Sequence, residues 1–222
     1  MIKLSNRLKK ISDYVSDNVS LVDIGCDHAL LDIYLCQNRK NIKIIASDIN
    51  ENALKGARSN IKKEHLEDKI EVRCSNGLDK IEKDEIDTIV VSGMGSHTII
   101  GIFHANLSKL KKVKSIIIQS NNHEYFLRKK MCELGYYIED ESLVKEGNII
   151  YTIILFKKGY RYYSYKSKLL GPILLKENSD LFKEKCSKEL EKLRYIYSVI
   201  PKKNIIYKLK TKYKIRMLES IK

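Results

Sequence analysis

The chain has 222 residues, enough for one full domain and an appendage, and a formal net charge of +14. No run of 18 apolar residues occurs, which excludes a membrane-spanning helix, and the first ten residues lack the apolar segment of a signal peptide. The five scattered cysteines form no Cys-x-x-Cys pair and no metal spacing with the histidines, so we expect reduced thiols, a cytoplasmic protein and no metal site.

The positive charge is concentrated at one end of the chain. Residues 1–156 carry a net charge of +1, whereas residues 157–222 carry +13. A basic appendage on a neutral domain is typical of a protein that binds a polyanion. The alternative is a solvated helical face without a partner.

Apolar patterning predicts an α/β domain in the first 156 residues. An amphipathic helix is expected over 5–15, and alternating strands and helices follow it. Two further strands form an antiparallel hairpin at the edge of the sheet. The pattern therefore predicts a doubly wound, mostly parallel sheet. Strands are expected at 20–24, 42–47, 70–74, 86–92, 115–119, 136–144 and 149–156, and helices at 29–38, 52–63, from the turn after the fourth strand to about 106, and at 124–134.

The first strand–helix–strand unit has the pattern of a nucleoside site. Its first strand ends in Asp23-Ile-Gly25, and its second ends in Asp48. A carboxylate at the end of the second strand can accept hydrogen bonds from both ribose hydroxyls. Asp23 and Gly25 could instead only turn the chain, but Asp48 at the expected distance favours the nucleoside site.

The turn after the first strand argues against a dinucleotide. A pyrophosphate needs the bare N–H groups of a Gly-x-Gly-x-x-Gly turn, and here only Gly25 is present. Asp23 and Asp27 would also repel a diphosphate. A cofactor with an ammonium group and a sulfonium suits these acids better, so the sequence favours S-adenosylmethionine over NAD.

The turn after the fourth strand bears on the substrate. Enzymes that methylate an exocyclic adenine amine have Asn/Asp-Pro-Pro-aromatic there, whereas this chain has Ser92-Gly-Met-Gly95. A ring nitrogen such as adenine N1 already presents a lone pair and needs placement more than a strong base. Gln119 and Asn121 are in reach of such a base, and Asp27 or His28 could accept a proton from the product or pass it to water.

The C-terminal part is predicted to be helical. A basic, tyrosine-rich connector spans 157–166, and Tyr160, Tyr162, Tyr163 and Tyr165 are its candidates for base stacking. A helical seam then recurs from Phe182 to Ile200, and Pro201 ends it. Asn204 can cap a second helix, giving an antiparallel hairpin. The expected buried stripe of that second helix is Ile205, Leu209, Tyr213 and Arg216.

Several of these segments together resemble the bacterial tRNA adenine-22 N1-methyltransferases, the TrmK family. The segments are Asp23-Ile-Gly-Cys-Asp-His-Ala-Leu-Leu, Ser92-Gly-Met-Gly-Ser, Gln119-Ser-Asn121, Asn148-Ile-Ile-Tyr151, Leu4-Ser-Asn-Arg-Leu8 and Gly171-Pro172. The chain departs from the family pattern at three positions. Ser96 stands where the family usually has glycine, Ser120 where it has proline, and Asn76 where it tends to an acid.

The resemblance implies a Rossmann-like class I methyltransferase domain over 1–157 and a basic helical hairpin, a coiled coil, over 158–222 that helps to bind tRNA. It implies S-adenosyl-L-methionine as methyl donor and tRNA as acceptor. Asp27 and Asn121 would face the target base as the catalytic pair. The residues expected to line the cofactor site are Asp23, Gly25, His28, Asp48, Ile49, Asn76, Gly77, Gly93, Met94 and Gly95. From the residues alone, Asn76 fits a simple Asn-Gly turn equally well.

The first hypothesis is therefore a tRNA adenine N1-methyltransferase that acts as a monomer. Two alternatives stay open: the same cofactor chemistry on another RNA base or on a small molecule, and an RNA-binding protein without catalysis.

Overall fold

The computed structural model describes residues 2–201 and 203–221. The chain divides into two compact units, one reaching to Tyr162 and the other starting at Tyr163. Each unit is described by itself.

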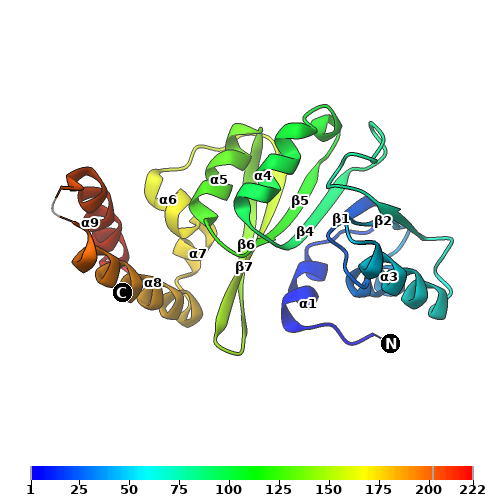
Figure 1. The fold of residues 1–222 in the computed structure, drawn as a ribbon, viewed down its shortest axis with the longest axis horizontal. Helices are drawn as coiled ribbons and strands as arrows, with labels where there is room; N and C mark the ends of the chain where they lie inside the picture. The colour runs from blue at the N-terminus through cyan, green and yellow to red at the C-terminus, as the bar shows by residue number, and fades with distance from the viewer. Residues whose placement is uncertain (1, 202, 222) are drawn as a thin grey trace. The chain divides into compact units, whose positions relative to one another are not determined.

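The first unit has the class I methyltransferase architecture that the sequence predicts (Figure 1). Its strands are β1 (Ser20–Ile24), β2 (Lys43–Asp48), β3 (Ile70–Cys74), β4 (Thr88–Met94), β5 (Ser115–Ser120), β6 (Tyr136–Glu146) and β7 (Ile149–Lys158). Its helices are α1 (Asn6–Asp13), α2 (Leu30–Asn38), α3 (Glu51–Lys63), α4 (Ser96–Ala105) and α5 (Glu124–Glu133), with a short 3₁₀ turn η1 (Lys109–Lys111).

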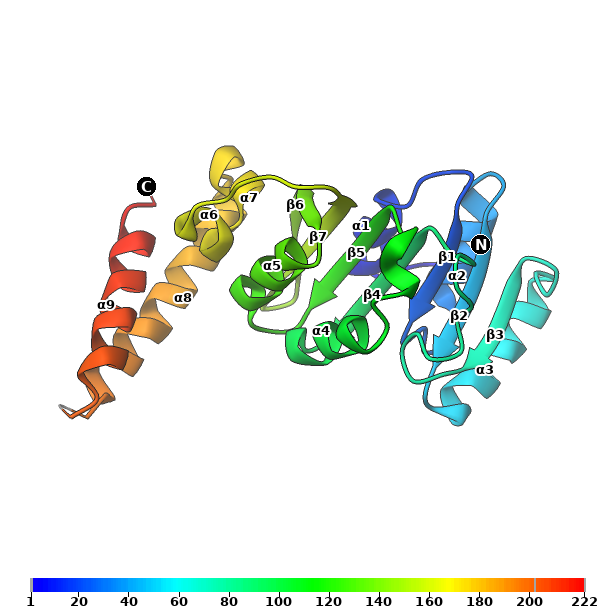
Figure 2. The same cartoon turned by 90° about the horizontal axis from the view of Figure 1, so that it is seen from above.

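The described strands form one sheet in the order β3-β2-β1-β4-β5-β7-β6. The pairs from β3 to β5 are parallel, and β7 lies antiparallel between β5 and β6. Helices α4 and α5 cover one face of the sheet and α1 lies on the other, as the two views together show (Figure 2). The predicted antiparallel hairpin is thus present at the edge.

The central strands are mostly apolar because helices cover both of their faces. Every residue of β5 is buried, and β1 is buried from Leu21 to Ile24. In the observed register of the parallel pairs, Val22 of β1 stands opposite Ile45 of β2 and Ile89 of β4. The register in turn sets which residues stand at the carboxyl edge.

Helix α1 anchors the N-terminal segment to the edge hairpin. The Ser5 hydroxyl accepts a hydrogen bond from the Leu8 N–H at 3.3 Å, which caps the helix. Ile11 is fully buried, and the helix packs against β6 and β7. The N–H of Arg7 donates to Glu146 of β6 at 2.7 Å. The first turn of α1 is therefore held in a fixed place.

The second unit is helical. It contains α6 (Tyr165–Leu170), α7 (Pro172–Glu177), α8 (Asp180–Val199) and α9 (Ile205–Glu219). Helices α8 and α9 pack against each other as the predicted hairpin. The seam of α8 is confirmed, since Phe182, Cys186 and Leu193 are buried. The short helices α6 and α7 were not predicted.

The predicted buried stripe of α9 is wrong. Ile205, Leu209 and Tyr213 are each more than half exposed, and the buried side chains of α9 are Thr211, Ile215 and Leu218. Apolar residues alternate with lysines in this helix, so two stripes compete, and contact with α8 decides between them. Asn204 precedes the helix as predicted, but its side chain makes no capping hydrogen bond.

No disulfide joins any of the five cysteines, all of which lie within the described residues. Over 2–201 and 203–221, no helix combines the length and apolar composition that crossing a bilayer requires.

Candidate active site

The carboxyl ends of β1, β2 and β4 meet at one edge of the sheet. Strand β1 is parallel to both neighbours, with Ile24 opposite Ser47 and Val91. The N–H groups of Gly25 and Cys26 both donate to the Ser47 carbonyl, at 2.7 and 3.0 Å. Gly25 has a φ of +81°, which glycine adopts without strain. The loop after β1 is thus held against the end of β2.

Three aspartates surround this edge. Asp23 is buried at 5% exposure, Asp48 is half-buried at the end of β2, and Asp27 is exposed. The Asp48 carboxylate accepts hydrogen bonds from the N–H groups of Asn50, at 2.8 Å, and Asp27, at 3.3 Å. Burial, together with the charge of Asp48, raises the pKa of Asp23 to about 7. A cationic ligand group would relieve this repulsion, so the edge favours a cation.

The end of β4 is a thin turn. The register with β5 shifts at Gly93, which has a φ of +78°. A Cβ at position 25 would lie 2.6 Å from the Cε atom of Met94, so this side chain lies over the Gly25 backbone. A Cβ at Gly95 would make only ordinary contacts, the nearest at 3.6 Å from Asn122. No neighbouring protein atom therefore excludes a side chain at position 95, and the space beside this residue can hold a ligand.

A chain of amides fixes this turn from the side of β5. Gln119 is fully buried, and its Oε1 accepts hydrogen bonds from the Gly93 N–H at 3.0 Å and from Arg7 Nη1 at 2.5 Å. Its Nε2 donates to Asn121 Oδ1 at 3.1 Å, and Asn121 Nδ2 donates to the Gly93 carbonyl at 2.7 Å. The Arg7 guanidinium also lies 5.1 Å from the centre of the Tyr151 ring. The backbone N–H and the carbonyl of Gly93 are thus both held by amide side chains.

The predicted catalytic residues flank the turn from opposite sides. Asp27 follows β1 and Asn121 follows β5, and β4 lies between these strands in the sheet. Asp27 is exposed, with a φ of +51°, whereas the amide of Asn121 is engaged with Gly93 and Gln119. The arrangement leaves Asp27 available to a ligand, whereas hydrogen bonds within the site hold the side chain of Asn121 in place.

The remaining predicted cofactor residues lie on the loops after β1, β2 and β3. The His28 ring rests on α3, where a Cβ at Gly56 would stand 2.4 Å from its Nδ1. Ile49 is 70% exposed directly after Asp48, and Asn76 is exposed after β3. The following Gly77 is buried with a φ of +59°, and a Cβ there would stand 2.5 Å from Ile102. These roles in cofactor binding stay predictions.

Sequence reasoning missed a role for Arg7 in the site. Its segment entered only as part of the family resemblance, and its partner Gln119 is 112 residues away. The sequence signal for this role is weak, because Arg7 is one of several polar residues in α1, among them the buried Ser12. The structure brings it to the glycine turn through the docking of α1 on the edge hairpin.

A second missed residue is Asp32 in the first turn of α2. Its side chain is completely buried, and neither carboxylate oxygen has a hydrogen-bond partner within the described residues. Burial, with the nearby charge of Asp23, raises its pKa well above the usual range. An acid at this position usually only complements the helix dipole, so the sequence carried no signal of its burial.

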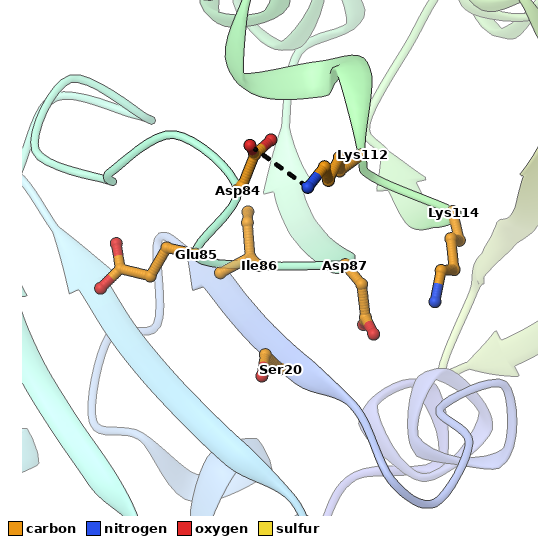
Figure 3. Close-up of a pocket in the computed structure, with 7 residues that line it drawn as sticks. All are labelled: Ser20, Asp84, Glu85, Ile86, Asp87, Lys112 and Lys114. Carbon is orange, nitrogen blue, oxygen red and sulfur yellow. Dashed lines mark ion pairs between the residues drawn. The ribbon is translucent and has the colours of Figure 1, made fainter.

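A cavity lies at the opposite edge of the sheet, where the strands begin, away from the site. It measures about 320 Å³, and Figure 3 shows its lining around the starts of β1, β4 and β5. Lys112 and Asp84 form an ion pair across it at 3.4 Å. Its lining residues are Ser20, Asp84, Glu85, Ile86, Asp87, Lys112 and Lys114. Ligands of open α/β sheets bind beyond the carboxyl ends of the strands, so this cavity is not the cofactor site.

Comparison with known proteins identifies the family of the chain. The family model described as TrmK, tRNA (adenine(22)-N(1))-methyltransferase, matches residues 21–220. The chain is 32% identical over 205 residues to the tRNA (adenine(22)-N(1))-methyltransferase of Bacillus subtilis, covering 90% of this chain and 86% of the relative.

Solved structures give the same result over nearly the whole chain. Streptococcus pneumoniae Sp1610 in complex with S-adenosyl-L-methionine is similar, with a TM-score of 0.90, 32% identity and 99% of each chain covered. Mycoplasma capricolum TrmK in complex with S-adenosyl-homocysteine has a TM-score of 0.87 and 29% identity, covering 97% of this chain and 96% of that one. The chain belongs to the TrmK family of tRNA (adenine(22)-N(1))-methyltransferases.

Proposed function

We propose that the chain transfers the methyl group of S-adenosyl-L-methionine to N1 of adenine 22 in tRNA. Membership of the TrmK family over residues 21–220 carries this function. The geometry agrees with it, because an acid-lined edge and a thin glycine turn stand together at the carboxyl ends of β1, β2 and β4.

The residues present fit the methyl donor. The buried carboxyl of Asp23 gains a counter-charge when an ammonium or sulfonium group binds nearby, and Asp48 keeps lone pairs for ribose hydroxyls beyond its two backbone bonds. Ile49 and Asn76 are exposed next to this edge and would lie against the adenine of the donor. When bound, the donor supplies an electrophilic methyl group.

The chain's own part in the reaction is placement. Adenine N1 attacks through an existing lone pair, so in-line orientation decides the rate more than a base does. Gly93 and Gly95 let the planar acceptor approach, and the amides of Gln119 and Asn121 keep the turn from shifting. The methylated base is positively charged until a proton leaves, and the exposed Asp27 can accept that proton or pass it to water, with His28 next to it as the alternative.

The second unit would supply tRNA affinity. Residues 157–222 carry a net charge of +13, and exposed lysines lie along α8 and α9. Lysines that neutralise phosphates bind folded RNA without reading its sequence. We also propose that the protein acts as a monomer, since one chain supplies every residue named above. We propose that it acts in the cytoplasm, where its five cysteines stay reduced.

Nucleoside mass spectrometry of tRNA tests this function. Purified protein, the methyl donor and unmodified tRNA are incubated, and the products are digested and mapped. We expect 1-methyladenosine at position 22, and Asp48→Ala should weaken donor binding severalfold because it loses the paired hydrogen bonds to the ribose. Methylation of another nucleoside would favour a different RNA base. Donor binding without any RNA product would favour a small-molecule acceptor. RNA binding without donor binding would leave an RNA-binding protein.

A further inference from the structure

A cluster of three aromatic rings stands next to the glycine turn and has no role in the chemistry above. His97 lies on α4, His123 directly before α5, and Phe126 on α5. The rings of His97 and Phe126 are stacked, with centroids 4.1 Å apart and an interplanar angle of 27°. His123 meets His97 edge-on at 5.3 Å and 73°. We call these three residues the ring cluster.

Hydrogen bonds between two loops fix the ring cluster. The Ser96 hydroxyl donates to the carbonyl of Asn122 at 2.5 Å, and the Ser120 hydroxyl donates to the same carbonyl at 3.2 Å. The Ser96 N–H donates to Asn122 Oδ1 at 3.3 Å. Ser96 and Ser120 are two of the positions where the chain departs from the family pattern. Ser96 joins the start of α4 to the loop after β5, and Ser120 holds that second loop from within, close in sequence to His123.

The cluster lies at the acceptor side of the site. Helix α4 begins directly after Gly95, so His97 is two residues from the turn over which the target base would lie. His123 is two residues from Asn121 on the neighbouring strand's loop. Both imidazoles are exposed, and Phe126 is half-buried beneath them. The cluster is thus an accessible aromatic surface at the point where RNA must enter.

Core packing and metal binding account for this arrangement less well than base stacking does. Core packing does not require it, because the two histidines are exposed. A metal site needs at least one more ligand, and the described residues contain no group of three or more His, Cys, Asp or Glu side chains that could hold a metal ion. Stacking of a nucleobase uses the features present, since imidazole and phenyl rings are the surfaces on which unstacked bases lie in RNA-binding proteins.

We propose that a nucleobase of the tRNA stacks on His97, supported by Phe126 and His123, while position 22 is methylated. This inference rests on the proposed function, because the base in question is either the flipped target adenine or a nucleotide beside it. The tetrad Ser92-Gly-Met-Gly95 contains no aromatic residue, and the ring cluster supplies aromatic rings from residues that follow β4 and β5. A flipped base loses its stacking in the tRNA, which this surface would restore.

Steady-state methylation kinetics with three variants test the proposal. His97→Ala removes the ring, His97→Phe keeps a ring of similar size, and His104→Ala changes an exposed histidine at the far end of the same helix. We expect kcat/KM for tRNA to fall roughly tenfold in His97→Ala, to return near the natural value in His97→Phe, and to be unchanged in His104→Ala. The affinity for the methyl donor should stay the same in all three, which shows that the fold and cofactor site are intact.

The two possible sources of the base give different results. If the target adenine stacks on the cluster, kcat falls in His97→Ala. If a neighbouring nucleotide does, KM rises, and the fluorescence of 2-aminopurine at position 21 or 23 is quenched by the natural protein but not by His97→Ala. Unchanged kinetics in His97→Ala, or equal losses in His97→Ala and His97→Phe, would overturn the proposal. The natural protein would still methylate tRNA in either case, so this failure is distinct from failure of the proposed function.

Discussion

At the scale of single residues, the site concentrates carboxyl groups that the fold leaves without cationic compensation. Asp23 is buried between β2 and β4, Asp48 lies on the next strand, and Asp32 is enclosed in α2. Burial is the main cause of the raised pKa of both Asp23 and Asp32; the charge of Asp48 raises the pKa of Asp23 further, and the charge of Asp23 raises that of Asp32. This arrangement costs stability in the free protein and becomes favourable when a cation binds.

Donor binding should depend on pH through Asp23. Its pKa is raised to about 7, so near neutral pH a large fraction of the free protein carries a proton there. A cationic ligand stabilises the carboxylate and lowers this pKa, so binding releases a proton and affinity rises between about pH 5 and about pH 8. Calorimetry in buffers of different ionisation enthalpy measures the release. Asp23→Asn should bind more weakly and without this pH dependence. A pH dependence retained in that variant would assign the proton to another group.

Asp32→Asn should make the fold more stable at high pH. The pKa of Asp32 is raised in the folded state, so folding favours the protonated form, and stability falls as pH rises above the unfolded value of about 4. The amide cannot ionise, so we expect its free energy of unfolding to exceed that of the natural protein by about 1–3 kcal/mol near pH 8. The difference should shrink towards about pH 4. Urea titrations at several pH values measure this, with the exposed Asp13→Asn as a control that should change little. Equal pH slopes in all three proteins would contradict it.

At the scale of elements, the acceptor side depends on the loops after β4 and β5 and on α1. Arg7 reaches Gln119, which holds Gly93, and the two serine hydroxyls share the carbonyl of Asn122. The turn is therefore placed by groups from three separate segments. A substitution that adds bulk to the turn would change the space for the acceptor without unfolding the sheet.

Gly95→Val tests that space. The backbone of Gly95 has a φ of −73° and ψ of 144°, which valine adopts readily, and a Cβ there stands 3.6 Å from the nearest atom. We expect methyl transfer to be abolished while donor affinity stays nearly unchanged. Isothermal calorimetry and a methylation assay measure the two properties. Gly101→Val is the matched control, because a Cβ on that exposed helical glycine meets no atom within 4 Å, and its activity should be retained. Full activity of Gly95→Val would move the acceptor elsewhere.

The elements of the sheet were predictable from sequence because their apolar runs are long and their ends carry acids or glycine. Strands β1 and β3 have the predicted bounds, and β4 begins two residues later than predicted, since Ile86 and Asp87 precede its pairing. The interactions of Arg7 and Asp32 were not predictable. One depends on a partner 112 residues away, and the other on burial by several elements at once. The face of α9 was mispredicted because only its contact with α8 selects one of two similar stripes.

At the scale of the whole molecule, charge separates the two functions. The part that contains the site is nearly neutral, with a net charge of +1 over 1–156, and the remaining residues carry +13. A nearly neutral domain attracts RNA only weakly, so we expect the basic residues to supply the long-range attraction. Affinity for tRNA should therefore come mainly from the second unit.

The affinity for tRNA should fall steeply as the salt concentration rises. Each lysine that neutralises a phosphate releases a counterion, so the logarithm of the affinity declines linearly with the logarithm of salt concentration. The double variant Lys210→Gln/Lys212→Gln removes two exposed charges from α9 and should reduce the slope by roughly one for each phosphate that is no longer neutralised. Filter binding at several salt concentrations measures the slope. Lys62→Gln/Lys63→Gln, on exposed positions of α3, should leave it unchanged. If the slope fell in Lys62→Gln/Lys63→Gln and stayed the same in Lys210→Gln/Lys212→Gln, the RNA would lie on the first unit.

The shared carbonyl of Asn122 has a consequence for exchanging parts between relatives. The hydroxyls of Ser96 and Ser120 both donate to this one carbonyl, so the two loops depend on each other's residues. A chimera that replaces only one of these loops, and with it one serine by a residue without a hydroxyl, would lose one of the two hydrogen bonds to this carbonyl. Grafting both loops together would keep the donors and the acceptor from the same parent protein.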